Sequence, residues 1–273
     1  MDLEVLRKSL VYIVPGMEQA AVRAELRYHA DADDALRMDV YLPPELPTGA
    51  RRPGVLFIHG GPVPSDLPLR PKDWGVYRSY GRLMAASGLV GITFNHRYYG
   101  MDHLEQAAHD IETAIAYVRA HANDFNLDPD RLALWAFSGG GPFLSLALRE
   151  HLPYVRCLVS YYALLDLRPF QGRAAGAVTD AVLHAFSPVA HLEAGAAPAF
   201  PILVARAGQD QPTLNGTIDS FVQAALAANL PIELMNHLRG QHAFDILDAD
   251  DRSREIIART VTFVQMHLGE AEC

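Results

Sequence analysis

The chain has 273 residues, of which half are hydrophobic and a fifth are charged, and its formal net charge at pH 7 is −9. This balance is typical of a folded protein with a large core and argues against a disordered chain. The negative charge, without a dense run of lysine and arginine, argues against sequence-independent binding of nucleic acid and against docking on anionic lipid.

The N-terminal residues do not resemble a targeting segment. Asp2 and Glu4 stand where a signal peptide carries positive charge, and no apolar stretch follows them. No segment reaches the roughly 18 uninterrupted apolar residues of a membrane span. The cysteines, Cys157 and Cys273, lack the spacing of a zinc or redox site, and a disulfide framework is not expected. We therefore expect a cytoplasmic protein with no metal and no cofactor.

The first fifty residues predict antiparallel strands at one edge of a sheet. Residues 22–28 and 36–41 alternate between apolar and polar side chains, and an acidic turn at residues 31–34 separates them. Such alternation is typical of strands with one buried face.

From about Arg51 onward, short apolar runs alternate with segments of helical period. Near-continuous apolar runs are typical of strands buried on both faces, as in a parallel sheet covered by helices. The runs lie at residues 55–58, 89–94, 132–136, 157–161, 202–205 and 232–235. Residues 128–130, Asp-Pro-Asp, form a turn signal directly before the run at 132.

Apolar residues at spacings of three or four predict helices between these runs, most clearly over residues 104–118 and 257–268. Strand–helix alternation of this kind predicts an α/β fold with a doubly wound, mostly parallel sheet. Residues 163–198 are rich in Ala, Gly and Pro and interrupt the alternation, which indicates a small helical cap or crossover. We expect a single domain over residues 1–273.

The strongest local signal is residues 135–141, Trp-Ala-Phe-Ser-Gly-Gly-Gly, where a buried strand ends and a helix should begin. A serine there matches a nucleophile elbow, a turn so sharp that Ser138 must adopt a strained backbone conformation that exposes its hydroxyl. Residues two positions before and after the serine must be small, as Ala136 and Gly140 are. The alternative interpretation is a flexible glycine loop.

A second signal is the segment His59-Gly60-Gly61-Pro62, directly after the run at 55–58. A loop at this place supplies a backbone N–H to an oxyanion hole, and the other N–H comes from the residue after the nucleophile, here Gly139. Gly61 is the first candidate for the loop donor and Gly60 the second, because Pro62 has no N–H. The alternative is a plain glycine turn in which His59 caps or packs locally.

The candidate acid and base follow the next strands. Asp210 lies just after the run at 202–205, at the edge of the sheet where catalytic groups gather, and His242 lies in a loop before the last helix. In the order Ser138, Asp210, His242, the histidine would act as general base and the aspartate would orient it. Asp166 is the rival acid, while Asp245 is expected to cap the last helix or bind the local loop.

With these residues in place, the chain resembles the α/β-hydrolase superfamily, and within it the dienelactone hydrolase-like and acetyl-esterase-like members. The resemblance covers about residues 38–268. It includes residues 128–131, Asp-Pro-Asp-Arg, and residues 186–188, Phe-Ser-Pro. Residues 240–245 are similar to the family segment Gly-x-His-Gly-Phe, with Ala243 in place of the second glycine. The resemblance implies a serine hydrolase that cleaves an ester bond.

Three functions are compatible with these motifs. The leading hypothesis is a serine esterase acting on a small acyl ester through an acyl-enzyme. The second is an aminopeptidase or acyl-peptide hydrolase, because the segment 59–62 also resembles prolyl oligopeptidase-type peptidases. The third is a degenerate hydrolase fold that binds a small ligand, suggested by the departures at Pro62 and Ala243.

The expected partner is a small-molecule ester, with no nucleic acid and no membrane, and a homodimer through an edge strand or the last helix is compatible with the sequence. Aromatic side chains are expected to narrow the pocket and to favour short acyl groups. The candidates are Trp74, Tyr77, Tyr98, Tyr99 and Phe170.

Overall fold

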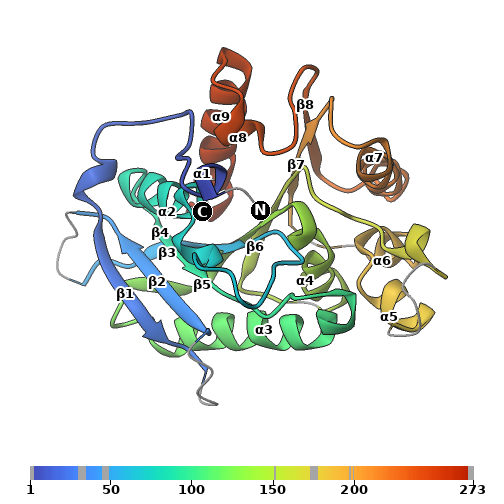
Figure 1. The fold of residues 1–273 in the computed structure, drawn as a ribbon. Coiled ribbons are helices and arrows are strands. Elements are labelled where there is room, and N and C mark those ends of the chain that lie inside the picture. Colours follow the sequence, from blue (N-terminus) through green and yellow to red (C-terminus); the bar gives the residue numbers. More distant parts are fainter. Residues whose placement is uncertain are drawn as a thin grey trace.

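Eight strands form one sheet in the order β1-β2-β4-β3-β5-β6-β7-β8 (Figure 1). The computed structural model describes residues 3–29, 35–44, 49–150, 152–172, 178–196, 198 and 200–269. The strands are β1 (Ala21–Arg27), β2 (Arg37–Leu42), β3 (Arg52–Ile58), β4 (Val90–Phe94), β5 (Leu127–Phe137), β6 (Val155–Tyr161), β7 (Ile202–Ala207) and β8 (Ile232–His237). Strand β2 runs antiparallel to both β1 and β4, and the other neighbours pair in parallel. This arrangement confirms the predicted fold class, including the antiparallel edge strands.

Helices cover both faces of the sheet. The α-helices are α1 (Leu3–Leu6), α2 (Gly75–Ala86), α3 (Leu104–Ala120), α4 (Ser145–Arg149), α5 (Asp180–Ala185), α6 (Pro188–Glu193), α7 (Pro212–Ala227), α8 (Phe244–Leu247) and α9 (Asp251–Leu268). Short 3-10 helices are η1 (Met17–Gln19), η2 (Pro71–Asp73), η3 (Met101–His103), η4 (Ser138–Leu144) and η5 (Arg168–Phe170). Within the described part of the chain, none of these helices has the length and apolar character needed to cross a lipid bilayer.

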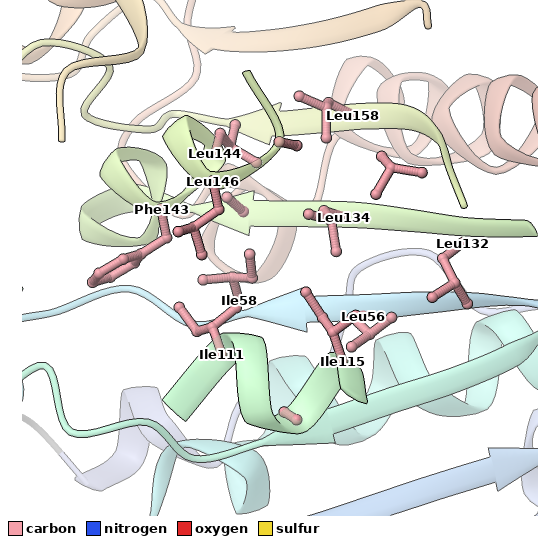
Figure 2. Close-up of a cluster of buried hydrophobic side chains, with 14 of the residues drawn as sticks. Leu56, Ile58, Ile111, Ile115, Leu132, Leu134, Phe143, Leu144, Leu146 and Leu158 are labelled. Carbon is pink, nitrogen blue, oxygen red and sulfur yellow. The ribbon is translucent and has the colours of Figure 1, made fainter. Parts of the chain in front are cut away.

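Successive side chains of the central strands pack into two separate hydrophobic cores. Val55 and Phe57 of β3 join the cluster under α2 and α9, whereas Leu56 and Ile58 join the cluster under α3, α4 and α7. Figure 2 shows the second cluster, in which side chains of β3, β5 and β6 meet Ile111 and Ile115 of α3. Alternate side chains of a strand point to opposite faces, so burial on both faces requires the continuous apolar runs seen in the sequence.

The strand predicted from residue 132 begins earlier, at Leu127. The Asp-Pro-Asp turn is present inside it, because the N–H of Asp130 donates to the Asp128 carboxylate over 3.0 Å. The pairing of β5 with β3 shifts register between Arg52 and Gly54, opposite this turn. The turn residues therefore make an irregularity within β5, since the chain resumes parallel pairing on both sides of it.

The segment at 163–198 is helical where it is described, with η5, α5 and α6. Helix α6 packs against α7 and α4, and Leu183 and Phe186 are buried in the same core as α3, so this segment extends one side of the sheet (Figure 1). Its residues 173–177 and 197 lie outside the described residues, as do the acidic turn at 31–34 and Cys273. Cys157 is a buried free thiol. The single-domain organisation stays a prediction.

A buried lysine fixes the segment that leads into α2. The side chain of Lys72 is 1% exposed, and its Nζ lies 2.8 Å from Asp73 Oδ1 and 3.2 Å from both carboxylate oxygens of Asp39. Nζ also donates to Glu25 of β1. These contacts hold η2 against β1 and β2.

Replacing Lys72 with methionine should lower the free energy of unfolding by about 3–5 kcal/mol, because the Asp39 carboxylate would be left buried without its counter-ion. Urea denaturation of both proteins measures this difference. Lys8, the other lysine in the sequence, is exposed, and Lys8→Met should change stability by less than about 0.5 kcal/mol. Equal midpoints for Lys72→Met and Lys8→Met would show that the buried charge cluster is not stabilising.

Candidate active site

Ser138 stands at the sharp turn between β5 and η4. Its φ is 51°, in the left-handed region, which confirms the strained backbone conformation predicted for this position. A Cβ on Gly140 would lie 2.7 Å from the carbonyl oxygen of Ile58, at the end of β3. The turn is therefore pressed against the neighbouring strand, and only a residue without a side chain fits at position 140.

The structure brings Ser138, His242 and Asp210 together from three separate loops at the carboxyl edge of the sheet. Nε2 of His242 lies 2.9 Å from Oγ of Ser138, and its Nδ1 lies 2.5 Å from Oδ2 of Asp210. The loops after β7 and β8 are joined by a hydrogen bond from the N–H of Gln209 to the carbonyl of Gly240 over 2.9 Å. This bond fixes the aspartate loop relative to the histidine loop.

The two carboxylates considered as the acid have different environments. The side chain of Asp210 is 2% exposed, and its second oxygen accepts from the N–H of Gln211 over 2.7 Å. Asp166 instead forms a bidentate salt bridge with Arg168, with Nε 2.9 Å from Oδ1 and Nη2 2.7 Å from Oδ2. Only Asp210 of the two contacts the His242 ring.

The His59–Pro62 loop lies directly against the elbow. A Cβ on Gly60 would lie 3.0 Å from Cβ of Ser138, and a Cβ on Gly139 would lie 1.9 Å from the carbonyl oxygen of Gly61. The N–H of Gly60 donates to the hydroxyl of Tyr77 over 3.0 Å. Among the described residues, the N–H groups of Gly61 and Gly139 have no acceptor. These two groups are therefore the donors available to a substrate oxygen.

His59 orients the peptide unit that carries the Gly61 N–H. Its ring is buried and stacks on His96 with 3.6 Å between ring centroids. The backbone N–H of His96 donates to Nε2 of His59 over 3.2 Å, so the proton is on Nδ1, which donates to the carbonyl of Gly60 over 2.8 Å. Burial lowers the pKa of His59 to about 4, which keeps the ring neutral at pH 7.

Asp245 lies beneath the His242 loop as a buried carboxylate. It accepts from the hydroxyls of Tyr80 over 2.9 Å and Tyr162 over 2.8 Å, and the Tyr162 ring lies 4.8 Å from the His242 ring between centroids. Burial raises the pKa of Asp245 to about 6. Asp245 was expected to cap the last helix or to bind the local loop. The first role is wrong, because Asp250 caps α9 by accepting from the N–H of Ser253. In place of the second, the carboxylate binds two tyrosines that are distant in sequence.

The raised pKa of Asp245 predicts a specific pH dependence of stability. Its ordinary value is 3.8, so between about pH 4 and 6 the folded protein binds more protons here than the unfolded chain, and stability falls as pH rises. Asp245→Asn removes this titration. From pH 4 to pH 8 the unfolding free energy of the variant should gain about 2 kcal/mol relative to the original protein. Urea denaturation across this range measures the difference, and parallel pH curves would contradict the prediction.

A cavity of about 220 Å³ opens beside Ser138 and His242. Two of the aromatic side chains expected there, Trp74 and Tyr77, line it. The other three lie elsewhere. Tyr98 packs behind Gly61, Tyr99 lines a different surface hollow, and Phe170 packs against the core under α3.

Other walls of this cavity were not anticipated from the sequence. They are Val5 and Leu6 of α1, Val76 of α2, Phe137, Tyr162, Ala243 and Ile246. Tyr162 directly follows β6, a position at the carboxyl edge of the sheet that could have indicated it. Ala243 has a φ of 60°, a left-handed conformation that accounts for the glycine that the similar family segment has there.

Comparison with known proteins gives matches among esterases. The family model BD-FAE matches residues 38–151. The probable carboxylic ester hydrolase LipM of Mycobacterium tuberculosis is 26% identical over 209 residues, which cover 64% of this chain and 46% of that protein. The match therefore spans less than half of the length of this relative.

Solved structures are similar over nearly the whole chain. Esterase B from Lactobacillus rhamnosis has a TM-score of 0.74 at 16% identity, and the match covers 94% of this chain and 88% of that chain. A thermophilic esterase from Thermogutta terrifontis, bound to butyrate, has a TM-score of 0.68 at 19% identity, with 94% and 98% covered. With its sheet order, its serine at a strained turn after β5 and these structural matches, the chain has an α/β-hydrolase fold.

Proposed function

We propose that the protein is a carboxylesterase that hydrolyses small acyl esters through an acyl-enzyme. The observation that carries the proposal is the continuous hydrogen-bond chain from Ser138 through His242 to Asp210, with distances of 2.9 and 2.5 Å. The names of the matched relatives and structures support an ester bond as the target.

In the proposed mechanism, Oγ of Ser138 attacks the ester carbonyl carbon while Nε2 of His242 takes the hydroxyl proton. The carbonyl oxygen becomes an oxyanion, which accepts hydrogen bonds from the N–H groups of Gly61 and Gly139. His242 then gives its proton to the leaving alcohol, and the acyl group stays on Ser138. Water, deprotonated by His242, releases the acid and restores the serine. Asp210 holds the ring in the tautomer that presents Nε2 as acceptor.

A fluorophosphonate probe tests the proposal, because it reacts with an activated serine and forms a stable adduct. We expect the original protein to be labelled and to hydrolyse p-nitrophenyl acetate, and Ser138→Ala to lose the label. Ser145 is a control, because it is buried in α4 behind the elbow. Its replacement by alanine should leave the label in place. Labelling that persists in Ser138→Ala would remove this serine from the mechanism.

The peptidase alternative has no comparable support, and assays with aminoacyl-nitroanilides beside short-chain esters separate it from the esterase. The ligand-binder alternative conflicts with the intact hydrogen-bond chain. We further propose the dienelactone hydrolase-like assignment, a small-molecule ester as the partner, and a cytoplasmic location. A homodimer stays a prediction.

A further inference from the structure

We propose that the N-terminal segment of the chain, residues 3–11, closes the acyl pocket and sets the longest acyl group that the enzyme accepts. This inference rests on the proposed esterase function and extends it to substrate choice. Val5 and Leu6 line the cavity that contains Ser138 and His242, together with Val76 of α2 and Ile246 of α8. Residues from the very start of the chain therefore border the reacting group.

The segment is held in place on both sides of the cavity. Next to α2, the carbonyl oxygens of Arg7 and Lys8 approach so closely that a Cβ on Gly75 would lie 2.4 Å from each. Farther along, the N–H of Val11 donates to the carbonyl of Asp245 over 2.9 Å. Leu6 is 5% exposed and Leu10 is 3% exposed, and both belong to the core under α2 and α9. Such a segment forms a fixed wall for the cavity.

We assign the cavity to the acyl group of the ester because of its apolar lining, which includes the side chains Leu6, Val76 and Ile246. The leaving alcohol departs beside Nε2 of His242, which also borders the cavity. Because the His242 side chain is 41% exposed, a small alcohol can leave to solvent. A hydrocarbon chain attached to the carbonyl carbon removes apolar surface from water in the cavity, whereas a charged or sugar-like acyl group would lose hydration.

The volume limits the length of that chain. A cavity of about 150 Å³ holds one benzene molecule. At about 220 Å³, this cavity has room for an acyl group of about six carbons with its carbonyl at Ser138, by the same comparison. We expect a longer chain to meet Leu6 and Val5, which line the cavity.

The test compares p-nitrophenyl esters from acetate to decanoate as ratios of kcat/KM, so that a general loss of activity cancels. We expect the ratio of octanoate to acetate to rise at least about tenfold in Leu6→Ala, the effect of relieving one misfitting methylene in an apolar pocket. Val5→Phe should lower the ratio of hexanoate to acetate by a similar factor. Leu3, on the same helix, is 41% exposed and does not line the cavity, so Leu3→Ala should keep the original ratios.

Leu6 also belongs to the core, so Leu6→Ala can destabilise the protein, and thermal unfolding of each variant is recorded for this reason. Val5 is only partly buried, so Val5→Phe tests the effect on chain-length preference independently of the core. The proposal would be overturned if both variants kept the original kcat/KM ratios between acyl chain lengths. It would also be overturned if the ratios changed only in a second series of esters, in which the acyl group is constant and the alcohol varies. The esterase assignment is judged separately, by fluorophosphonate labelling of the original protein. If the original protein is labelled but both variants keep its chain-length preference, only the proposed role of residues 3–11 is rejected, and the esterase assignment stands.

Discussion

Replacing Ser138 with alanine should lower kcat for p-nitrophenyl acetate by a factor on the order of 10⁶, and the Ser138→Ala/His242→Ala double variant should lose no more than either single variant. The reason is that the serine and histidine act as one unit in the proposed mechanism. Oγ is a weak nucleophile until Nε2, 2.9 Å away, takes its proton, so removal of either group abolishes the same step. Steady-state kinetics with active-site titration measure all three proteins.

The acid is tested within the same series. Asp210→Asn should lower kcat by about 10⁴-fold, because an amide cannot accept the Nδ1 proton in the same way and the ring changes tautomer. Asp166→Asn is the matched control, since this carboxylate pairs with Arg168 and does not contact the ring. It should retain nearly all activity. Additive losses for Ser138 and His242, or a larger loss at Asp166 than at Asp210, would contradict the assigned roles.

The fold could be predicted because strands that are buried on both faces of the sheet have a recognisable sequence pattern. A strand such as β5 needs apolar residues at every position of its inner part, and helices such as α3 need them at every third or fourth position. The Asp-Pro-Asp turn at 128–130 was predicted to precede the strand, whereas it lies inside β5. The sequence could not distinguish these positions, because a turn before a strand and an irregularity inside a strand both favour Asp and Pro.

The convergence of the three candidate catalytic groups could be predicted for a related reason. Parallel strands end at one edge of the sheet, so Ser138 after β5, Asp210 after β7 and His242 after β8 converge although they are far apart in sequence. The local backbone adds a second constraint, since only small residues fit around the elbow.

The cavity walls could not be predicted in this way. Val5 and Leu6 reach the site because the N-terminal segment packs over α2, and the contact depends on a glycine at position 75, far from both in the sequence. The role of Asp245 depends on Tyr80 and Tyr162, which come from α2 and from the end of β6. Such contacts between distant segments follow from tertiary packing and have no periodic signal.

The same packing, through Tyr77, leaves Gly61 as the loop donor that we propose for the oxyanion. By accepting from the Gly60 N–H, its hydroxyl satisfies one donor of the loop, and burial raises the pKa of Tyr77 well above its ordinary value, so the hydroxyl stays protonated. His59 holds the next peptide unit through the Gly60 carbonyl. Of the two N–H groups in the loop, only that of Gly61 is therefore left to donate to the proposed oxyanion. The sequence alone left Gly60 and Gly61 as alternatives.

Gly139→Ala should lower kcat/KM for p-nitrophenyl acetate by at least about 10²–10³-fold, the usual effect of losing one oxyanion donor. The added Cβ would lie 1.9 Å from the carbonyl oxygen of Gly61, so the backbone of residues 59–62 must move away. Because Gly61 and Gly139 are the two donors that we propose for the oxyanion, this displacement would separate them, and a shift of about 1 Å is enough to cost on the order of 10²-fold. Stopped-flow measurement of acylation isolates the affected step.

The matched control is Gly216→Ala. Gly216 is exposed inside α7 and has nothing near its missing Cβ, so alanine should leave kcat/KM unchanged and stabilise the helix by about 1 kcal/mol. Fluorophosphonate labelling gives a further distinction, because Ser138 and His242 are untouched in Gly139→Ala. We expect slow but detectable labelling, since the phosphonyl oxygen also needs the two donors. A Gly139→Ala enzyme with full acylation rate would mean that the oxyanion is bound elsewhere, and the assignment of Gly61 and Gly139 would fall with it.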